Sequence, residues 1–199
     1  MGSDAKLDQR MAFMRFDERA CSALRAIQPL IDAEINAALG QFYDQVRAFP
    51  ETRGKFRDEA HIAAAERAQA THWRRIARAD YGDSYVSDVE RIGRAHVRVE
   101  LEPRWYIGGY AVVAEELIRS VISKRAKGLF GAGKSDQALA DGLSAMVKAI
   151  FLDMDLAISS YIAFMDEQRR ALEVEREAGQ RRQAEAVKAL GVALARLAE

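Results

Sequence analysis

Only three prolines occur in this sequence, and they divide it into a few long segments with the composition of α-helices. Proline breaks the interior of a helix but is well tolerated in its first turn, so Pro29, Pro50 and Pro103 are expected to mark helix boundaries. Alanine is frequent between them, and no run of alternating β-branched residues predicts a strand. We therefore predict an all-α protein.

Apolar residues recur at helical spacing along most of the chain. Residues 1–13 are expected to form a loosely held arm with a short helix in it. A glycine-rich stretch at 128–133 is the clearest loop. The expected helices are 17–27 with Asp17 as its N-cap, 29–48, 58–78, one from about Ser84 to before Pro103, 103–127, and one from Ser135 almost to the end.

Charge and cysteine content exclude several classes of protein. Lys and Arg together number 30, as do Asp and Glu, so the formal net charge is zero and no nucleic-acid partner is indicated. The single cysteine, Cys21, excludes an internal disulfide and fits a reducing cytoplasm. No apolar run approaches the roughly 18 residues of a membrane span, and the N-terminus lacks a signal peptide's apolar region. We expect a cytoplasmic protein without a membrane span.

The segment 92–110 holds the residues with the most chemical character. Ile92, His96 and Val99 fall on one helix face at i, i+4 and i+7, so the imidazole is expected to point into the core. Neutral imidazole is the commonest protein ligand for iron, although a lone histidine on an apolar face is more often a core residue bonded to a neighbour. Tyr106, on the next helix, is placed to fold back and accept a hydrogen bond from the imidazole.

Other chemistry has little support in the sequence. There is no phosphate-binding glycine loop, no nucleophile elbow and no Cys/His cluster for zinc. Paired Glu-x-x-His motifs of the kind that hold two irons in helical bundles are also absent. We therefore do not expect an enzyme.

Three motifs together resemble the haem-binding domain of globin-coupled sensors. They are Ile92-Gly93-x-x-His96, Leu101-Glu102-Pro103-x-Trp105-Tyr106-Ile107-Gly108-Gly109-Tyr110, and Gln69-x-x-His72-Trp73 with Tyr85 after it. The resemblance covers roughly residues 10 to 165 and implies a globin-like fold, haem b as cofactor, and His96 as the proximal ligand of the haem iron. Glu100 departs from the pattern, because the family often has glycine there. This change concerns the corner after the proximal helix and leaves the ligand untouched.

The resemblance also implies a tyrosine in the second helix of the domain that donates a hydrogen bond to bound oxygen. Tyr43 is the candidate, because it follows Phe42 in that helix and precedes Pro50 by two turns. A hydrogen bond from a phenol counts for more inside a dry pocket than in water. The expected cofactor-binding residues are Tyr43, Phe42, Phe56, Gln69, Trp73, Ile92, Val99 and Tyr106.

Other roles are open for three aromatic or imidazole side chains near the expected site. Phe42 and Phe56 fit either the haem wall or the protein core. His72 is a minor candidate for a second iron ligand, since the family commonly carries His-Trp at this place without using it as a ligand.

The C-terminal part changes character near residue 166. The stretch 166–185 is strongly charged, and the end of the chain resembles the start of a chemotaxis-transducer signalling module. We predict a globin sensor domain at 1–165 and a helical, coiled-coil linker to a missing output module at 166–199. The residues with coiled-coil spacing are Val187, Leu190, Leu194 and Leu197.

The predicted function is that of a haem-based gas sensor in a signal transducer. Oxygen, or carbon monoxide or nitric oxide, would bind at the His96-held iron and alter a homodimer formed through helices 103–127 and 135–165. Tyr106 is the candidate switch between His96 and this interface. The apolar stripe expected to add to the dimer contact is Tyr110, Val113 and Leu117.

The leading output is aerotaxis through chemotaxis signalling proteins, and the alternative is a diguanylate cyclase or a histidine kinase. A haem-free globin-like stress sensor or lipid binder would share the helices but would not need His96. A nitric-oxide dioxygenase would need a reductase partner that this sequence does not encode.

Overall fold

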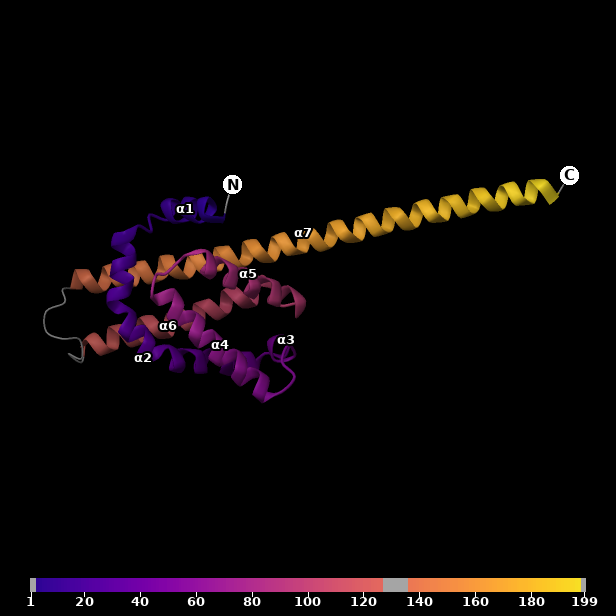
Figure 1. Cartoon of the computed structure of the whole chain (residues 1–199). Helices are drawn as coiled ribbons and strands as arrows, with labels where there is room; N and C mark the ends of the chain where they lie inside the picture. The colour runs from indigo at the N-terminus through magenta and orange to yellow at the C-terminus, as the bar shows by residue number, and fades with distance from the viewer. Residues whose placement is uncertain (1–2, 127–135, 198–199) are drawn as a thin grey trace.

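The computed structural model describes residues 3–126 and 136–197, and every regular element in these two ranges is an α-helix (Figure 1). This confirms the all-α prediction. The glycine-rich loop predicted at 128–133 lies outside the described residues. The helices are α1 (Ser3–Phe13), α2 (Glu18–Ala48), α3 (Pro50–Arg53), α4 (Glu59–Ala77), α5 (Asp83–Arg98), α6 (Pro103–Ala126) and α7 (Asp136–Leu197).

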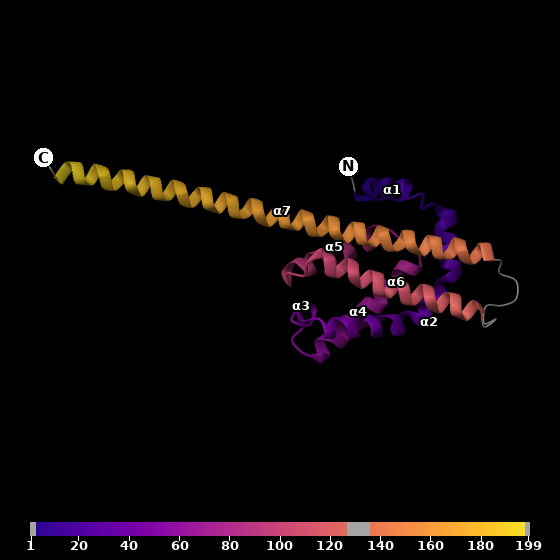
Figure 2. The same cartoon turned by 180° about the vertical axis from the view of Figure 1, so that it is seen from behind.

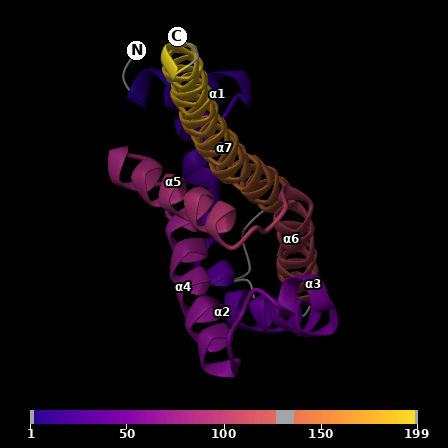
Figure 3. The ribbon, with the colours of Figure 1, turned by 90° about the vertical axis from the view of Figure 1, so that its right-hand side faces the viewer.

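The helices pack around one apolar core. α2 contacts α4, α6 and α7, while α5 packs mainly against α7. In Figure 3, α4 and α5 lie on one side of the domain and α6 on the other. The largest side chains of the core are fully buried, and they include Phe16, Leu39, Ile62, Trp73, Tyr85, Leu117 and Leu152.

α2 replaces the two helices that were predicted on either side of Pro29. The helix runs from Glu18 to Ala48 with Pro29 inside it, and it bends along its course (Figures 1 and 2). Proline lacks an N–H and its ring crowds the carbonyl four residues earlier, so it can kink a helix without ending it. Leu24 and Ile31 are buried on either side of the proline and hold both halves on the core.

The N-terminal arm is helical, as predicted, but it is not loosely held. Leu7 is buried, and the guanidinium of Arg10 lies 3.3 Å from the carboxylate of Asp155. Arg10 also donates a hydrogen bond of 3.1 Å to the hydroxyl of Ser159. α1 is therefore fixed to α7.

The apolar stripe that was predicted for a dimer contact belongs to the core of a single chain. Tyr110, Val113 and Leu117 are only 4%, 1% and 0% exposed. Helical periodicity identifies a face that is covered but not what covers it, and here α2 and α7 pack against α6. That part of the dimer prediction is wrong.

α7 is one helix of 62 residues. Its first part contributes Met146, Leu152 and Ala157 to the core, and its charged second part extends away from the other helices (Figures 1 and 2). The predicted long C-terminal helix is thus confirmed. Within the two described ranges, no helix is both long and apolar enough to cross a bilayer.

Candidate haem-binding site

A cavity of about 370 Å³ opens between α2, α4, α5 and α6, with walls that are mostly apolar and aromatic. This volume lies in the range of roughly 300–1,000 Å³ that is usual for ligand pockets. Apart from Trp73, every residue predicted to contact the cofactor lines this cavity. The lining consists of Phe42, Tyr43, Val46, Thr52, Lys55, Phe56, His61, Ala65, Ala68, Gln69, His72, Ile92, Ala95, His96, Val99, Leu101, Trp105, Tyr106 and Tyr110.

Trp73 lies in the core instead of the cavity wall. Its side chain is 2% exposed, and its ring packs on Tyr110 with 5.2 Å between the ring centroids. Gln69 and His72 of the same helix reach the cavity, while Trp73 faces α6 behind it. The sequence placed Trp73 correctly on the inner face of its helix, but it could not distinguish core from cavity.

His96 projects from the last turn of α5 into the cavity. Burial lowers the pKa of His96 from its usual 6.5 to about 4, because the imidazolium form would lose its hydration. The imidazole is therefore neutral near pH 7, which is the form that ligates iron. No described residue forms a hydrogen bond with its ring nitrogens.

The corner after His96 is held by the backbone. The amide of Leu101 donates to the carbonyl of His96, and the amide of Glu100 donates to that of Val97, both at 2.9 Å. Glu100 has a φ of 53°, the left-handed conformation that glycine usually supplies at this kind of helix end. The chain thus makes a tight turn here with glutamate in the place where glycine is usual.

Tyr106 contacts His96, as predicted. The two rings meet edge to face, with 4.9 Å between their centroids and 63° between their planes. The tyrosine hydroxyl does not bond the imidazole, however. It lies 2.8 Å from the hydroxyl of Tyr110 and 3.4 Å from a carboxylate oxygen of Asp153. The nearest polar partner of the Tyr106 hydroxyl is thus Tyr110, which itself donates to the Asp153 carboxylate, so Tyr106 belongs to that hydrogen-bond network and not to the imidazole.

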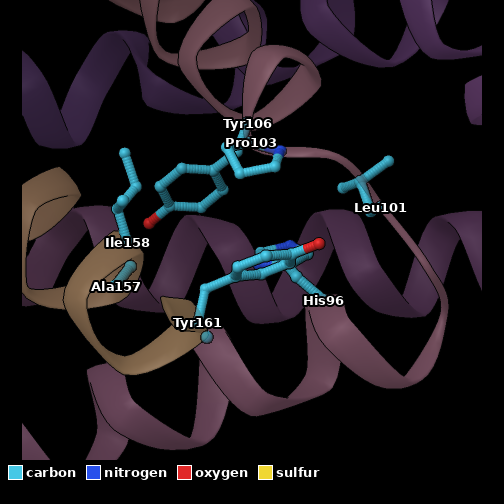
Figure 4. A pocket seen from close by; sticks show the side chains of 8 residues that line it. His96, Leu101, Pro103, Tyr106, Ala157, Ile158 and Tyr161 are labelled. Atoms are coloured by element: carbon cyan, nitrogen blue, oxygen red, sulfur yellow. The ribbon is translucent and has the colours of Figure 1, made fainter. Parts of the chain in front are cut away.

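A second and much smaller cavity, of about 10 Å³, lies beside His96 at the junction of α5, α6 and α7. Figure 4 shows Tyr106 and Pro103 above it, with Ala157 and Ile158 of α7 at its side. His96 thus lines both cavities, and α7 forms part of the wall of the smaller one through Ala157, Ile158 and Tyr161.

The hydroxyl of Tyr43 and the buried amide oxygen of Gln69 lie in the wall of the large cavity and have no hydrogen-bond partner among the described residues. The Tyr43 ring packs edge-on against Phe42 and Phe56, and burial raises the pKa of its hydroxyl far above the usual 10. Tyr43 therefore remains a neutral donor.

This arrangement fits a haem. Apolar and aromatic walls suit a flat macrocycle, a neutral imidazole from α5 can hold the iron, and the phenol of α2 can donate to a bound gas. His72 fits the role of a second iron ligand poorly. Its Nε2 bonds Asp153 at 2.9 Å, and its ring stacks on Tyr85 at 5.9 Å.

Asp153 of α7 is a residue that the sequence reasoning missed. Its carboxylate is fully buried and has four groups within hydrogen-bonding distance. Oδ1 accepts from the Tyr85 hydroxyl and from His72 Nε2, while Oδ2 accepts from Tyr110 and, at 3.4 Å, faces Tyr106. Burial, followed by the nearby Asp153 charge, raises the pKa of all three tyrosines well above 10, so they remain neutral donors.

The sequence did contain a signal for Asp153. It lies three residues after Ile150 and four before Ala157, so it falls on the apolar stripe of its helix and not on the charged face. A carboxylate at such a position needs buried donors, and the tyrosines at this end of the domain are the available ones.

Known proteins resemble this chain in sequence and in fold. The protoglobin family model matches residues 3–167. The heme-based aerotactic transducer HemAT of Halobacterium salinarum is 27% identical over 164 residues, in a match that covers 80% of this chain and 33% of HemAT. The chain thus spans about a third of the length of this relative.

Two solved structures share the fold. The globin domain of a Geobacter sulfurreducens globin-coupled sensor has a TM-score of 0.67 and 19% identity, over 77% of this chain and 96% of that one. The ferric globin domain of E. coli DosC has a TM-score of 0.61 and 14% identity, over 78% and 99%. The fold is therefore globin-like, and the chain belongs to the protoglobin family.

Proposed function

We propose that this chain is the haem-based gas-sensing domain of a signal transducer. One observation carries the proposal: His96, a half-buried and neutral imidazole without a hydrogen-bond partner among the described residues, stands in the wall of a largely apolar cavity of about 370 Å³. Haem iron held by this imidazole would supply reversible binding of a diatomic gas. The Halobacterium salinarum relative is a heme-based aerotactic transducer, which supports oxygen as the signal and aerotaxis as the output.

The residues of the cavity have separate parts in this proposal. His96 would hold the iron of haem b, and the Tyr43 hydroxyl would donate a hydrogen bond to the bound gas. Gln69 is the second polar group that can reach the gas. The apolar residues proposed to pack against the macrocycle are Phe42, Phe56, Ile92 and Val99, all of which line the cavity.

The sensor is further proposed to work as a homodimer through α6 and α7. Both helices present exposed apolar side chains that no residue of the described ranges covers. Burial of such side chains against a second copy would remove them from water. They are Ile107 and Ile122 of α6, and Val147, Phe151 and Ile162 of α7, each between 39% and 57% exposed. Residues 166–199 are proposed as the linker to the remaining two thirds of a transducer.

The absorption spectrum of the purified protein tests the haem assignment. We expect a Soret band that responds to dithionite, oxygen and carbon monoxide. Replacement of His96 by Ala should abolish stoichiometric haem uptake, because the only proposed protein bond to the iron is lost. Free imidazole, which fits the space left by the deleted ring, should restore haem binding to that variant.

Thermal unfolding gives an independent measurement. Haem that binds only the folded chain raises its melting temperature, so the wild type should lose this stabilisation when haem is withheld. His96→Ala should show little difference with and without haem. Full haem occupancy and an unchanged ferrous spectrum in this variant would contradict the proposal.

A further inference from the structure

Asp153 connects the wall of the large cavity to the helix that leaves the domain. It belongs to α7 and does not itself line the cavity. Three of its four partners, His72, Tyr106 and Tyr110, do line it. They come from α4 and α6, and the fourth partner, Tyr85, comes from α5. One carboxylate on α7 therefore joins all three helices.

Asp153 and its four partners form a hydrogen-bonded cluster. The members of this cluster have little freedom to move separately. An ionised carboxylate has about four acceptor positions, and four groups approach Asp153. Its side chain is 0% exposed, so no water can replace a donor that swings away. A shift of Tyr110 or His72 must therefore either leave a buried carboxylate short of a donor or draw α7 along with it.

The helix that carries His96 touches α7 at the same level. A Cβ atom on Gly93 would come within 2.6 Å of the Ala157 carbonyl oxygen and 2.9 Å of the Ser160 Cβ. The Ser160 hydroxyl also donates to the carbonyl of Glu90 at 3.1 Å. α5 thus lies in backbone contact with α7 one turn beyond Asp153, so a movement of the proximal helix reaches the same stretch of α7.

We propose that Asp153 is a positioning residue that couples gas binding in the cavity to the conformation of α7. The inference rests on the proposed function, since it supplies the step between the cavity and the linker. Gas can shift α7 only if its affinity differs between two arrangements of the cavity wall, and the cluster makes those arrangements depend on α7. The coupling is reciprocal, so loosening the cluster must also change gas affinity.

Hydrogen exchange of the full chain, loaded with haem, tests this coupling. The measured quantity is the difference in exchange of the α7 amides between the unliganded ferrous form and the form with carbon monoxide. We expect such a difference in the wild type between about residues 150 and 165. Asp153→Asn keeps the shape of the side chain but removes its charge and one acceptor, so the difference should disappear. Carbon monoxide should still bind stoichiometrically, with an affinity changed by about five-fold or more.

Two further variants sharpen the result. Tyr85→Phe removes one donor from Asp153 without touching the cavity, and it should reduce the difference in the same direction even if Asp153→Asn folds poorly. Asp155→Asn is the matched control. This residue is two positions away on the same helix and pairs with Arg10 outside the cluster, so the difference should persist.

A general loss of stability would raise exchange in both forms alike, whereas loss of coupling removes only their difference. A ligand-dependent difference that survives in both Asp153→Asn and Tyr85→Phe would overturn the inference, as would its absence in the wild type. If the wild type fails to load haem or to bind carbon monoxide, the proposed function fails, and this inference fails with it.

Discussion

The hydroxyl of Tyr43 is a donor that no described residue satisfies. Tyr43→Phe removes this donor and keeps the ring that packs on Phe42 and Phe56. Loss of one hydrogen bond of about 1–3 kcal/mol corresponds to roughly 5- to 150-fold faster release of oxygen. The off-rate of carbon monoxide should change less, because bound carbon monoxide is a weaker hydrogen-bond acceptor than bound oxygen.

Stopped-flow measurement of the oxygen off-rate checks this. Tyr81→Phe is a suitable control, because the Tyr81 hydroxyl donates to the Ile76 carbonyl at 3.0 Å, away from the cavity. Equal off-rates for the wild type and Tyr43→Phe would assign the hydrogen bond to another residue, of which Gln69 is the first to examine.

His96 gives the haem-free protein a pH-dependent stability. Burial lowers its pKa in the folded chain to about 4, against 6.5 in the unfolded chain. The unfolded state therefore binds this proton more readily. The contribution of His96 to the free energy of unfolding is complete above pH 6.5 and is lost as the pH falls to 4, by about 3 kcal/mol.

Urea unfolding of the haem-free protein across this pH range measures the effect. His96→Leu lacks the titrating group, so its free energy of unfolding should fall less steeply with acid than that of the wild type. Carboxylates titrate in both proteins and cancel in the comparison. Parallel curves would show that the imidazole is as well hydrated in the folded chain as in the unfolded one.

At the scale of helices, the end of α5 is strained at one residue. Glu100 adopts a φ of 53°, which costs a residue with a Cβ atom about 1–2 kcal/mol relative to glycine. A glycine at this position would relieve the strain, but its greater conformational freedom in the unfolded chain would offset part of the stability gained. Glu100→Gly should therefore raise the free energy of unfolding by about 1 kcal/mol, as measured in urea.

The same substitution at Glu102, which lies outside α5 and has no left-handed backbone, provides the control. Glu102→Gly should not stabilise the protein. A destabilised Glu100→Gly variant would mean that the side chain makes contributions at this corner that outweigh the backbone strain.

Helix periodicity and proline positions were sufficient to predict most helices and the face of His96, because both depend on local spacing. Pro29 shows where this reasoning fails. A proline has the same local effect where a helix starts and where a helix is kinked, so its position alone does not distinguish the two. The helix is kinked here because the apolar stripe continues past the proline, from Leu24 to Ile31, and holds both halves on the core.

Among the site residues, His96, Tyr43 and Tyr106 could be placed from their motifs. The partners of Asp153 could not, because they come from three different helices and no spacing along the chain encodes their meeting. The position of Trp73 in the core and not in the cavity wall could not be predicted either, since both environments are apolar.

At the scale of the whole molecule, assembly should not require the charged end of the chain. A chain that ends at Met165 keeps the exposed apolar side chains of α6 and α7 and should remain a dimer in sedimentation experiments. Phe151 is 57% exposed, and Phe151→Glu should give a monomer because it places a charge in the proposed contact.

Val174→Glu is the matched control, since Val174 is 68% exposed in the charged part of α7. The full-length chain with this change should remain a dimer. A monomer for the chain that ends at Met165 would instead move the contact into residues 166–199.

α7 contains no proline, and between Asp166 and Leu197 it continues as one helix. At 1.5 Å per residue, the stretch of α7 from Asp153 to Leu197 is roughly 66 Å long. If the proposed contacts of Asp153 and Gly93 hold α7 in place, a tilt of about 5° at Asp153 would displace the end of the helix by roughly 6 Å, which exceeds the length of a hydrogen bond. Under the proposed coupling, a bound gas would need to produce only a small movement in the cavity, because the length of the helix would amplify it.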